Sequence, residues 1–210
     1  MNEIWLFKTN EDILGEGESY YNLYGDYTYL LEGYYQTLQS QLSGINVHPT
    51  TQESLDAYII AIAMEKARIG NIAIPEYQIL TDKSKIDDFP VLGYAMNPIS
   101  SNSYIIDNLK FYEHKIKSLT LSGKYLALIQ RIPPEDYRLD TIRCVLGKTM
   151  VKEYQDFCMA VFKTFKVPLM KIKVIVTLDK YLLSAIEPLD YDTLSINEKK
   201  MLEGMGEWQK

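Results

Sequence analysis

The sequence predicts a mixed α/β protein of the α+β kind, folded as one domain in two lobes with mostly antiparallel sheets. Two apolar, strand-like runs at 125–132 and 141–146 are separated by Pro133-Pro134 and a charged connector. Apolar residues at three- and four-residue steps predict helices over 26–42 and 151–165. Neither a repeat nor a low-complexity linker divides the 210 residues, a length that suits one core or two small subdomains sharing one.

The first fifty residues predict a strand at 3–8, a helix over 26–42 with Asp26 as its N-cap, and a short strand at 45–47. The tyrosines of the helix favour core packing, with hydroxyls at the rim, over an aromatic binding face. A second helix begins at Thr50 or Thr51 and ends at Gly70, with Leu55, Ile59, Ile62 and Ala63 on one face.

The middle of the chain predicts strands at 72–81 and 89–98, then a small, polar loop at 100–103 and an amphipathic helix at 106–118. Beyond the two central strands and the 151–165 helix, residues 171–186 predict a hairpin that turns at Asp179-Lys180.

The hairpin's lysines predict that one of its faces meets solvent, because Lys171 and Lys173 alternate with Ile172 and Val174. Ser195 and Glu198 form the pattern of a capping box at the start of the last helix.

Composition excludes several classes of function. A formal net charge of −6 argues against a nucleic-acid partner, and no apolar run is long enough to span a membrane. The acidic N-terminus is unlike a secretory signal, so we expect a cytoplasmic protein. Two cysteines and two histidines do not form a metal or nucleophile pattern. The glycines at 15 and 17 stand among carboxylates without a following Lys-Ser/Thr, which argues against a phosphate loop.

Five segments appear in a familiar order. They are R-I-G-N-I-A-I-P-E-Y-Q-I-L-T (68–81), F-P-V-L-G-Y-A-M-N-P (89–98), I-Q-R-I (129–132), D-T-I-R-C-V-L-G (140–147) and S-A-I-E-P-L (184–189). With the helix before them, they resemble the ATP-grasp superfamily, in particular its branch of RimK-like ligases. The resemblance implies a single domain with an N-terminal segment at about 1–50, a first lobe at 51–124 and a second lobe at 125–210.

The resemblance also implies a site in which two lobes clamp ATP and magnesium for acyl-phosphate chemistry. Carried over residue by residue, Gln130, Arg131 and Ile132 would form the adenine hinge through their backbone groups. Arg143 would face the phosphates or the acyl intermediate, and Glu187 would stand at the position of a metal ligand. The alternative reading of Arg143 is an ion pair with an acid such as Asp140 or Glu187, and that of Glu187 is a structural carboxylate.

Several charged positions of the family pattern are changed here. Asn97 and Ala57 replace the two expected phosphate lysines, Arg131 replaces the hinge glutamate, and 173–175 lacks the expected aspartate. Pro188 or Leu189 replaces the final asparagine, and a segment with another arginine is missing. Losing this positive charge removes much of what a phosphoryl-transfer site needs.

Three hypotheses about function follow from the sequence. The first is a degenerate ATP-grasp protein that retains a nucleotide cleft and acts as a binding or regulatory module. The second is an active carboxylate–amine ligase in which Lys124 or Lys148 replaces the lost lysines. The third is a non-catalytic interaction protein that uses the tyrosine-rich helix at 26–42 to contact a protein partner or a second copy of itself.

Overall fold

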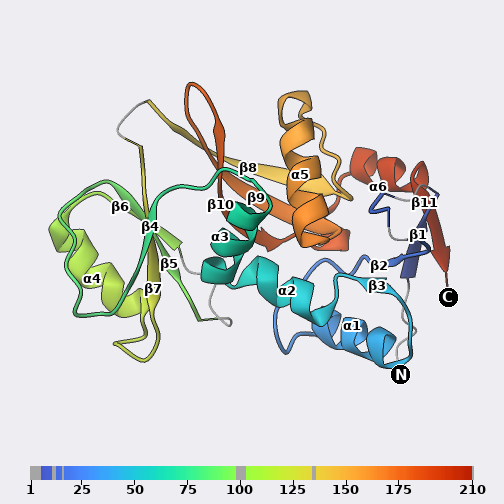
Figure 1. Ribbon diagram of the computed structural model, residues 1–210, viewed down its shortest axis with the longest axis horizontal. Helices are drawn as coiled ribbons and strands as arrows, with labels where there is room; N and C mark the ends of the chain where they lie inside the picture. Colours follow the sequence, from blue (N-terminus) through green and yellow to red (C-terminus); the bar gives the residue numbers. More distant parts are fainter. Residues whose placement is uncertain (1–5, 11–12, 16, 98–102, 134–135, 210) are drawn as a thin grey trace. The chain divides into compact units, whose positions relative to one another are not determined.

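The computed structural model describes residues 6–10, 13–15, 17–97, 103–133 and 136–209 (Figure 1). The chain divides into two compact units, each assembled from separated segments. Unit 1 comprises Met1–Ala57, Ile142–Ile172 and Glu187–Lys210, and unit 2 comprises Tyr58–Thr141 and Lys173–Ile186. The lobes expected from the sequence were continuous stretches, whereas both of these units are discontinuous.

The strands are β1 (Leu6–Thr9), β2 (Tyr20–Asn22), β3 (Val47–His48), β4 (Tyr77–Leu80), β5 (Val91–Ala95), β6 (Ser103–Ile106), β7 (Ala127–Arg131), β8 (Arg138–Val145), β9 (Leu169–Val176), β10 (Tyr181–Pro188) and β11 (Gly206–Gln209). The helices are α1 (Glu32–Leu42), α2 (Thr51–Tyr58), α3 (Ile60–Ile69), α4 (Leu109–Leu119), α5 (Gln155–Phe165) and α6 (Ile196–Glu203), with short 3₁₀ turns at Lys152–Tyr154 and Tyr191–Thr193.

Unit 2 contains a four-stranded sheet of order β4-β7-β5-β6 in which every neighbouring pair is antiparallel. Helix α4 packs on this sheet (Figure 1), and its buried Tyr112, Ile116 and Leu119 join strand residues in one apolar cluster. The helix approaches closely at Gly93, where a Cβ would stand 2.8 Å from the Leu119 side chain. A larger residue at Gly93 would therefore require the Leu119 side chain and its apolar neighbours to shift.

Unit 1 contains a four-stranded sheet of order β11-β1-β2-β3. The strands that come first and last in the sequence, β1 and β11, are neighbours in this sheet, and Phe7 pairs with Trp208 in antiparallel register. Helix α5 supplies a buried aromatic face, and Phe162 lies 6.1 Å from the Tyr21 ring, measured between centroids. The stripe predicted for this helix is confirmed at Cys158, Val161, Phe162 and Phe165, which are all fully buried, but the helix begins at Gln155 and not at 151, and Val151 is 47% exposed.

A third sheet has the order β10-β9-β8. Only four residues separate β9 from β10, so these adjacent strands form the antiparallel hairpin that the sequence predicted. The capping box is also confirmed: Ser195 accepts from the Glu198 N–H, and the Glu198 carboxylate accepts from the Ser195 N–H.

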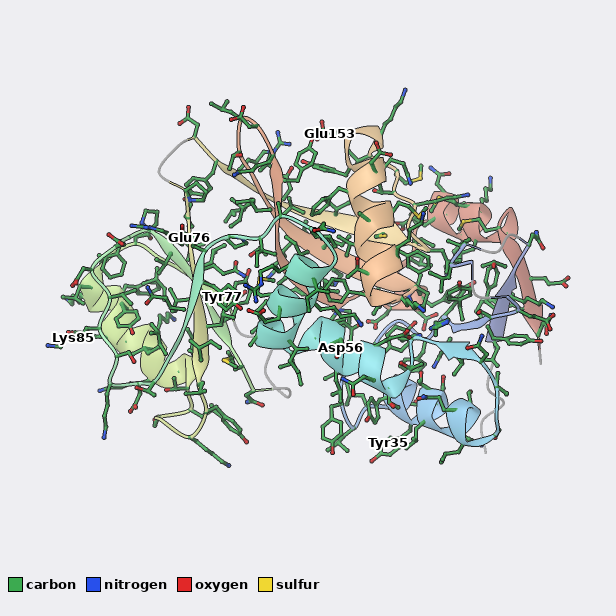
Figure 2. The ribbon with its side chains drawn as sticks, in the orientation of Figure 1. Tyr35, Asp56, Glu76, Tyr77, Lys85 and Glu153 are labelled. Carbon is green, nitrogen blue, oxygen red and sulfur yellow. The ribbon has the colours of Figure 1, made fainter. Side chains whose placement is uncertain are left out.

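The tyrosine-rich segment is where the sequence prediction fails most clearly. Helix α1 begins at Glu32 and not at Asp26, because the Asp26 carboxylate instead accepts a bond from the Thr28 N–H and Leu30 has a positive φ of 70°. The inward face of α1 carries small residues, whereas Tyr35 is 51% exposed and is labelled on this helix in Figure 2. The expected tyrosine core is reduced to Tyr27, which is fully buried.

Other differences are local. The predicted helix at 51–70 is broken at Ile59, whose ψ of 101° is extended, and separates into α2 and α3. Residues 103–106 form strand β6, which the sequence did not predict, and α4 starts at Leu109. Residues 3–5 of the first predicted strand, residue 98 of the strand predicted at 89–98 and 100–102 of the predicted loop lie outside the described part of the chain.

Candidate functional site

Gln130, the first expected hinge residue, is the centre of a buried hydrogen-bond network in unit 2. Its amide nitrogen donates to the Ser184 carbonyl at 2.7 Å, and its amide oxygen accepts from the Ser184 hydroxyl at 2.6 Å. The Tyr94 hydroxyl lies 2.7 Å from the Ser184 oxygen and is therefore the donor of that bond. The side chain of Gln130 thus joins strand β7 to strand β10, and Ser184 joins both to β5.

The neighbouring hinge positions face other partners. The Arg131 N–H donates to the Glu76 carbonyl at 2.8 Å, and the Arg131 guanidinium bonds to Asp88 at 2.6 Å and Glu76 at 3.4 Å (Glu76 is labelled in Figure 2). Ile132 is buried, with 4% of its surface exposed. A base bound through the backbone of these residues would therefore have to displace the Glu76 contact or use groups beyond the end of β7.

A cleft of about 390 Å³ lies within unit 2, and Tyr94 and Ser184 of the Gln130 network are among its lining residues. We call it the Lys173 cleft. Its lining residues come from β5, β6, β8, β9 and β10: Leu92, Tyr94, Ser103, Tyr104, Ile105, Leu139, Asp140, Thr141, Lys173, Val174 and Ser184. Its volume is within the usual range of sites for small molecules, and apolar walls with a few polar groups are typical of such sites.

Lys173 is the basic side chain among the described residues that line this cleft. Its ammonium donates to the Ser103 hydroxyl at 3.1 Å, which brings β9 to the first residue of β6. The alternation predicted for β9 is confirmed, because Lys171 and Lys173 are partly exposed and Ile172 and Val174 are buried, although Ser103 contacts Lys173. Reasoning from the sequence missed Lys173, Tyr94 and Ser184, although the two lysines of the otherwise apolar β9 were a visible signal.

Arg143 makes the ion pair that one reading of the sequence expected, but with a different acid. Its guanidinium donates to both carboxylate oxygens of Glu198, at 2.7 and 3.0 Å, and to the Thr193 carbonyl at 2.8 Å. Burial alone would raise the pKa of Glu198, but hydrogen bonds from Arg143 and Ser195 outweigh it and lower that pKa. The pair therefore attaches β8 to the start of α6 inside unit 1.

Glu187 lies near the end of β10 and is half-buried. Across the described part of the chain, no group of three or more His, Cys, Asp or Glu side chains is arranged to hold a metal ion. Magnesium needs close to octahedral oxygen coordination, so Glu187 and the other described residues do not form a magnesium site by themselves. The ligand role carried over to Glu187 stays a prediction, and we derive no chemical step through a metal.

The two lysines and two cysteines considered in the sequence analysis lie outside the Lys173 cleft. Lys124 and Lys148, suggested as replacements for the lost lysines, are not among the residues that line the Lys173 cleft. Cys144 and Cys158 are fully buried and unpaired, and burial raises the pKa of the Cys144 thiol well above its usual value. Within the described residues, no helix is both apolar enough and long enough to cross a membrane.

Comparison with known proteins supports the fold. The family model described as the RimK-like ATPgrasp N-terminal domain matches residues 101–204. No curated protein matches the sequence of this chain. Among solved structures, a RimK domain ATP-grasp protein from Sphaerobacter thermophilus is similar at a TM-score of 0.62 and 10% identity, over 81% of this chain and 76% of that one.

Two D-alanine–D-alanine ligases are also similar in structure. The enzyme from Bacillus anthracis has a TM-score of 0.60 and 12% identity, over 80% of this chain and 69% of that chain. The enzyme from Helicobacter pylori has a TM-score of 0.57 and 14% identity, over 80% and 63% of the two chains. The resemblance found in the sequence is thereby confirmed: this chain has the ATP-grasp fold, and its residues 101–204 match the RimK-like ATPgrasp N-terminal domain.

Proposed function

We propose that this chain is a nucleotide-binding module of the ATP-grasp fold that does not carry out phosphoryl transfer at the rate of a ligase. The observation that carries the proposal is the position of Lys173, whose ammonium lies in a cleft of about 390 Å³ beside the Ser103 hydroxyl. A lysine ammonium is a point charge suited to a phosphate group, and a neighbouring hydroxyl can donate to a phosphate oxygen. The apolar residues Leu92, Ile105 and Val174 provide a surface for a base or ribose.

The fold gives this assignment further support, because one similar structure is the Bacillus anthracis ligase complexed with ATP. The proposal that turnover is weak rests on charge. A transferring phosphoryl group requires several cations or a metal to neutralise its oxygens. Here Asn97 and Ala57 are buried at positions where the resemblance expects lysines. One lysine can hold a phosphate group, but it does not neutralise a transition state whose charge is spread over three oxygens.

The test is isothermal titration of the full chain with ATP and with a non-hydrolysable analogue, each in magnesium and in EDTA. Lys173→Met removes the ammonium but retains an unbranched side chain, and Lys171→Met makes the same change two residues earlier on β9, outside the cleft. We expect Lys173→Met to weaken binding about tenfold, as for loss of a hydrogen bond to a charged group. Lys171→Met should change affinity less than twofold.

Two results would count against the proposal. Equal affinities of the two methionine variants would remove Lys173 from the site, and no heat or saturation with either nucleotide would remove the site itself. Release of inorganic phosphate when amines and carboxylic acids are added would overturn the non-catalytic part and favour the active ligase. Phosphate release should therefore be measured in the same preparations.

A further inference from the structure

Unit 1 contains a larger cavity, of about 930 Å³, that the nucleotide proposal does not use. We call it the Trp208 cavity. It is bordered by the loop that follows β2, the first turns of α1, the segment after β10, and Trp208 of β11. All of its lining residues belong to unit 1, so its description requires only the internal structure of that unit.

Close backbone contacts fix the walls of this cavity. Gly25 has a φ of +96°, and a Cβ there would stand 2.2 Å from the Leu189 carbonyl oxygen. The Leu189 N–H donates to the Gly25 carbonyl at 3.2 Å, which holds the β2 loop against the segment after β10. Asn22, only 1% exposed, accepts from the Tyr24 N–H at 3.0 Å and donates to the Gly33 carbonyl at 3.2 Å, so α1 is held by the same loop.

Large apolar side chains remain exposed inside this hollow. Tyr24 is 39% exposed, Leu31 46% and Trp208 40%. Trp208 is fixed by edge contacts, with ring centroids 5.7 Å from Phe7 and 5.5 Å from Tyr191. Exposed apolar and aromatic surface that is gathered in one rigid concavity marks a binding site more often than scattered exposed residues do.

The charged residues that line the cavity are all acidic. Asp26, Glu32, Asp190 and Asp192 line the cavity, and no Lys, Arg or His is among the described lining residues. Within the described part of the chain, none of these four carboxylates is in an ion pair. The pKa of the Tyr24 phenol is raised, by burial first and then by Glu32, Asp190 and Asp26, which is consistent with a negative potential in the cavity.

The aromatic rings of the cavity also favour a positively charged ligand. The ammonium of Lys199 lies 4.8 Å from the Tyr191 ring centroid, so this ring already attracts a cation within the protein. Trp208, which lies edge-on to Tyr191, has the ring type that binds cations best. A ligand with a positive charge and an apolar body would therefore complement the carboxylates and the aromatic walls together.

We propose that the Trp208 cavity binds a small organic cation, a molecule that carries an ammonium or guanidinium group on an aliphatic or aromatic body. The positive group would lie among Glu32, Asp190 and Asp192, and the body against Tyr24, Leu31 and Trp208. This site lies in unit 1 and the Lys173 cleft in unit 2, so each proposal can fail without the other.

The test uses three probes of one shape titrated into the full chain: 2-phenylethylammonium, the neutral 2-phenylethanol and the anionic 3-phenylpropanoate. Binding is followed by ligand-observed NMR. We expect the ammonium to bind at least about tenfold more tightly than the alcohol, and the anion not to bind. Because exposed ion pairs are screened, raising the salt from 50 to 500 mM should weaken the ammonium severalfold but not the alcohol.

Matched variants separate the cavity from the overall charge of the protein. Asp190→Asn should weaken the ammonium about two- to fivefold, the range for a partly exposed ion pair. Glu113→Gln, on an exposed face of α4 in unit 2, removes the same charge and should leave the affinity unchanged. Trp208→Leu should weaken both the ammonium and the alcohol, and the ammonium more because it also loses the cation–π contact; thermal unfolding would check that β11 remains folded.

Three outcomes would overturn the proposal. The first is equal affinity for the ammonium and the alcohol, which would make the cavity merely apolar. The second is an equal loss from Asp190→Asn and Glu113→Gln, which would mean that only net charge matters. The third is full competition by millimolar magnesium or calcium, which would make the site one for inorganic cations.

Discussion

The hydrogen bonds of Gln130 allow a quantitative prediction about the stability of unit 2. Gln130→Met retains the length and approximate shape of the side chain but removes both bonds to Ser184, of 2.7 and 2.6 Å. The Ser184 carbonyl loses the donor that Gln130 provides, and its hydroxyl loses its acceptor. A buried group left without a partner costs about 1–3 kcal/mol, and the Ser184 hydroxyl still has the Tyr94 hydroxyl as a partner, so we expect the free energy of unfolding to fall by about 1–4 kcal/mol.

The cost should shrink when the partner is also removed, because the penalty comes from polar groups left unpaired. Adding Ser184→Ala to Gln130→Met removes the hydroxyl that has lost its acceptor. The double variant should therefore be less destabilised than the sum of the two single variants, by about 1 kcal/mol or more. Gln78→Met makes the same exchange at an exposed position of β4 and should change stability by less than about 0.5 kcal/mol.

The assay is urea unfolding followed by far-ultraviolet circular dichroism, with hydrogen exchange of the β7 amides to locate the loss in unit 2. A loss below about 0.5 kcal/mol for Gln130→Met would refute the reasoning, as would additive single and double variants. ATP titration of the same variant tests the hinge hypothesis. If a base is held only through backbone groups, the free energy of ATP binding should change less in Gln130→Met than the free energy of unfolding does.

Three further predictions concern unit 1. The lowered pKa of Glu198 contributes stability that is present above the usual carboxyl pKa of 4.5 and is lost as the pH falls through the lower folded value; Glu198→Gln should therefore be destabilised at pH 7, and the difference from the parent in urea unfolding should shrink below pH 4.5. Gly25→Ala should lower the free energy of unfolding by about 2 kcal/mol or more, because the new Cβ meets the opposite backbone. Gly44→Ala, also at positive φ but in open space, should lower it by only about 1 kcal/mol, with both variants measured by urea unfolding. Equal costs would contradict the close approach at Gly25. Cys144 and Cys158 should resist alkylation by iodoacetamide in the native state and react after unfolding, as read by intact mass, because both are fully buried.

Local signals in the sequence predicted several elements well. The stripe of α5 and the capping box at Ser195 each lie within a few turns of chain, so periodicity and cap chemistry determine them. The hairpin of β9 and β10 was predictable for the same reason. The order of these elements, more than any one motif, led to the ATP-grasp fold.

Elements that depend on distant partners were not predictable in this way. Strand β11 pairs with β1 at the other end of the chain, and neither its four residues nor those of β6 have a pattern that identifies them as strands. Asp26 is a good N-cap by residue type, but its carboxylate closes a local turn and Gly25 directs the loop toward Leu189. A tertiary contact thereby delayed the helix by six residues.

Lys173 shows how the same limitation affects the site. Alternation along β9 correctly separated its two faces, but periodicity cannot state what covers a face. The partner is Ser103, seventy residues earlier, on a strand that the sequence did not predict. The polar residues of the cleft come from five strands, so their meeting is a property of the fold and of no single motif. Transfer of the family's site positions onto this sequence selected Arg143, which is paired with Glu198, and did not select Lys173. Such a transfer compares positions within motifs, so it cannot detect a charge that another strand brings to the site.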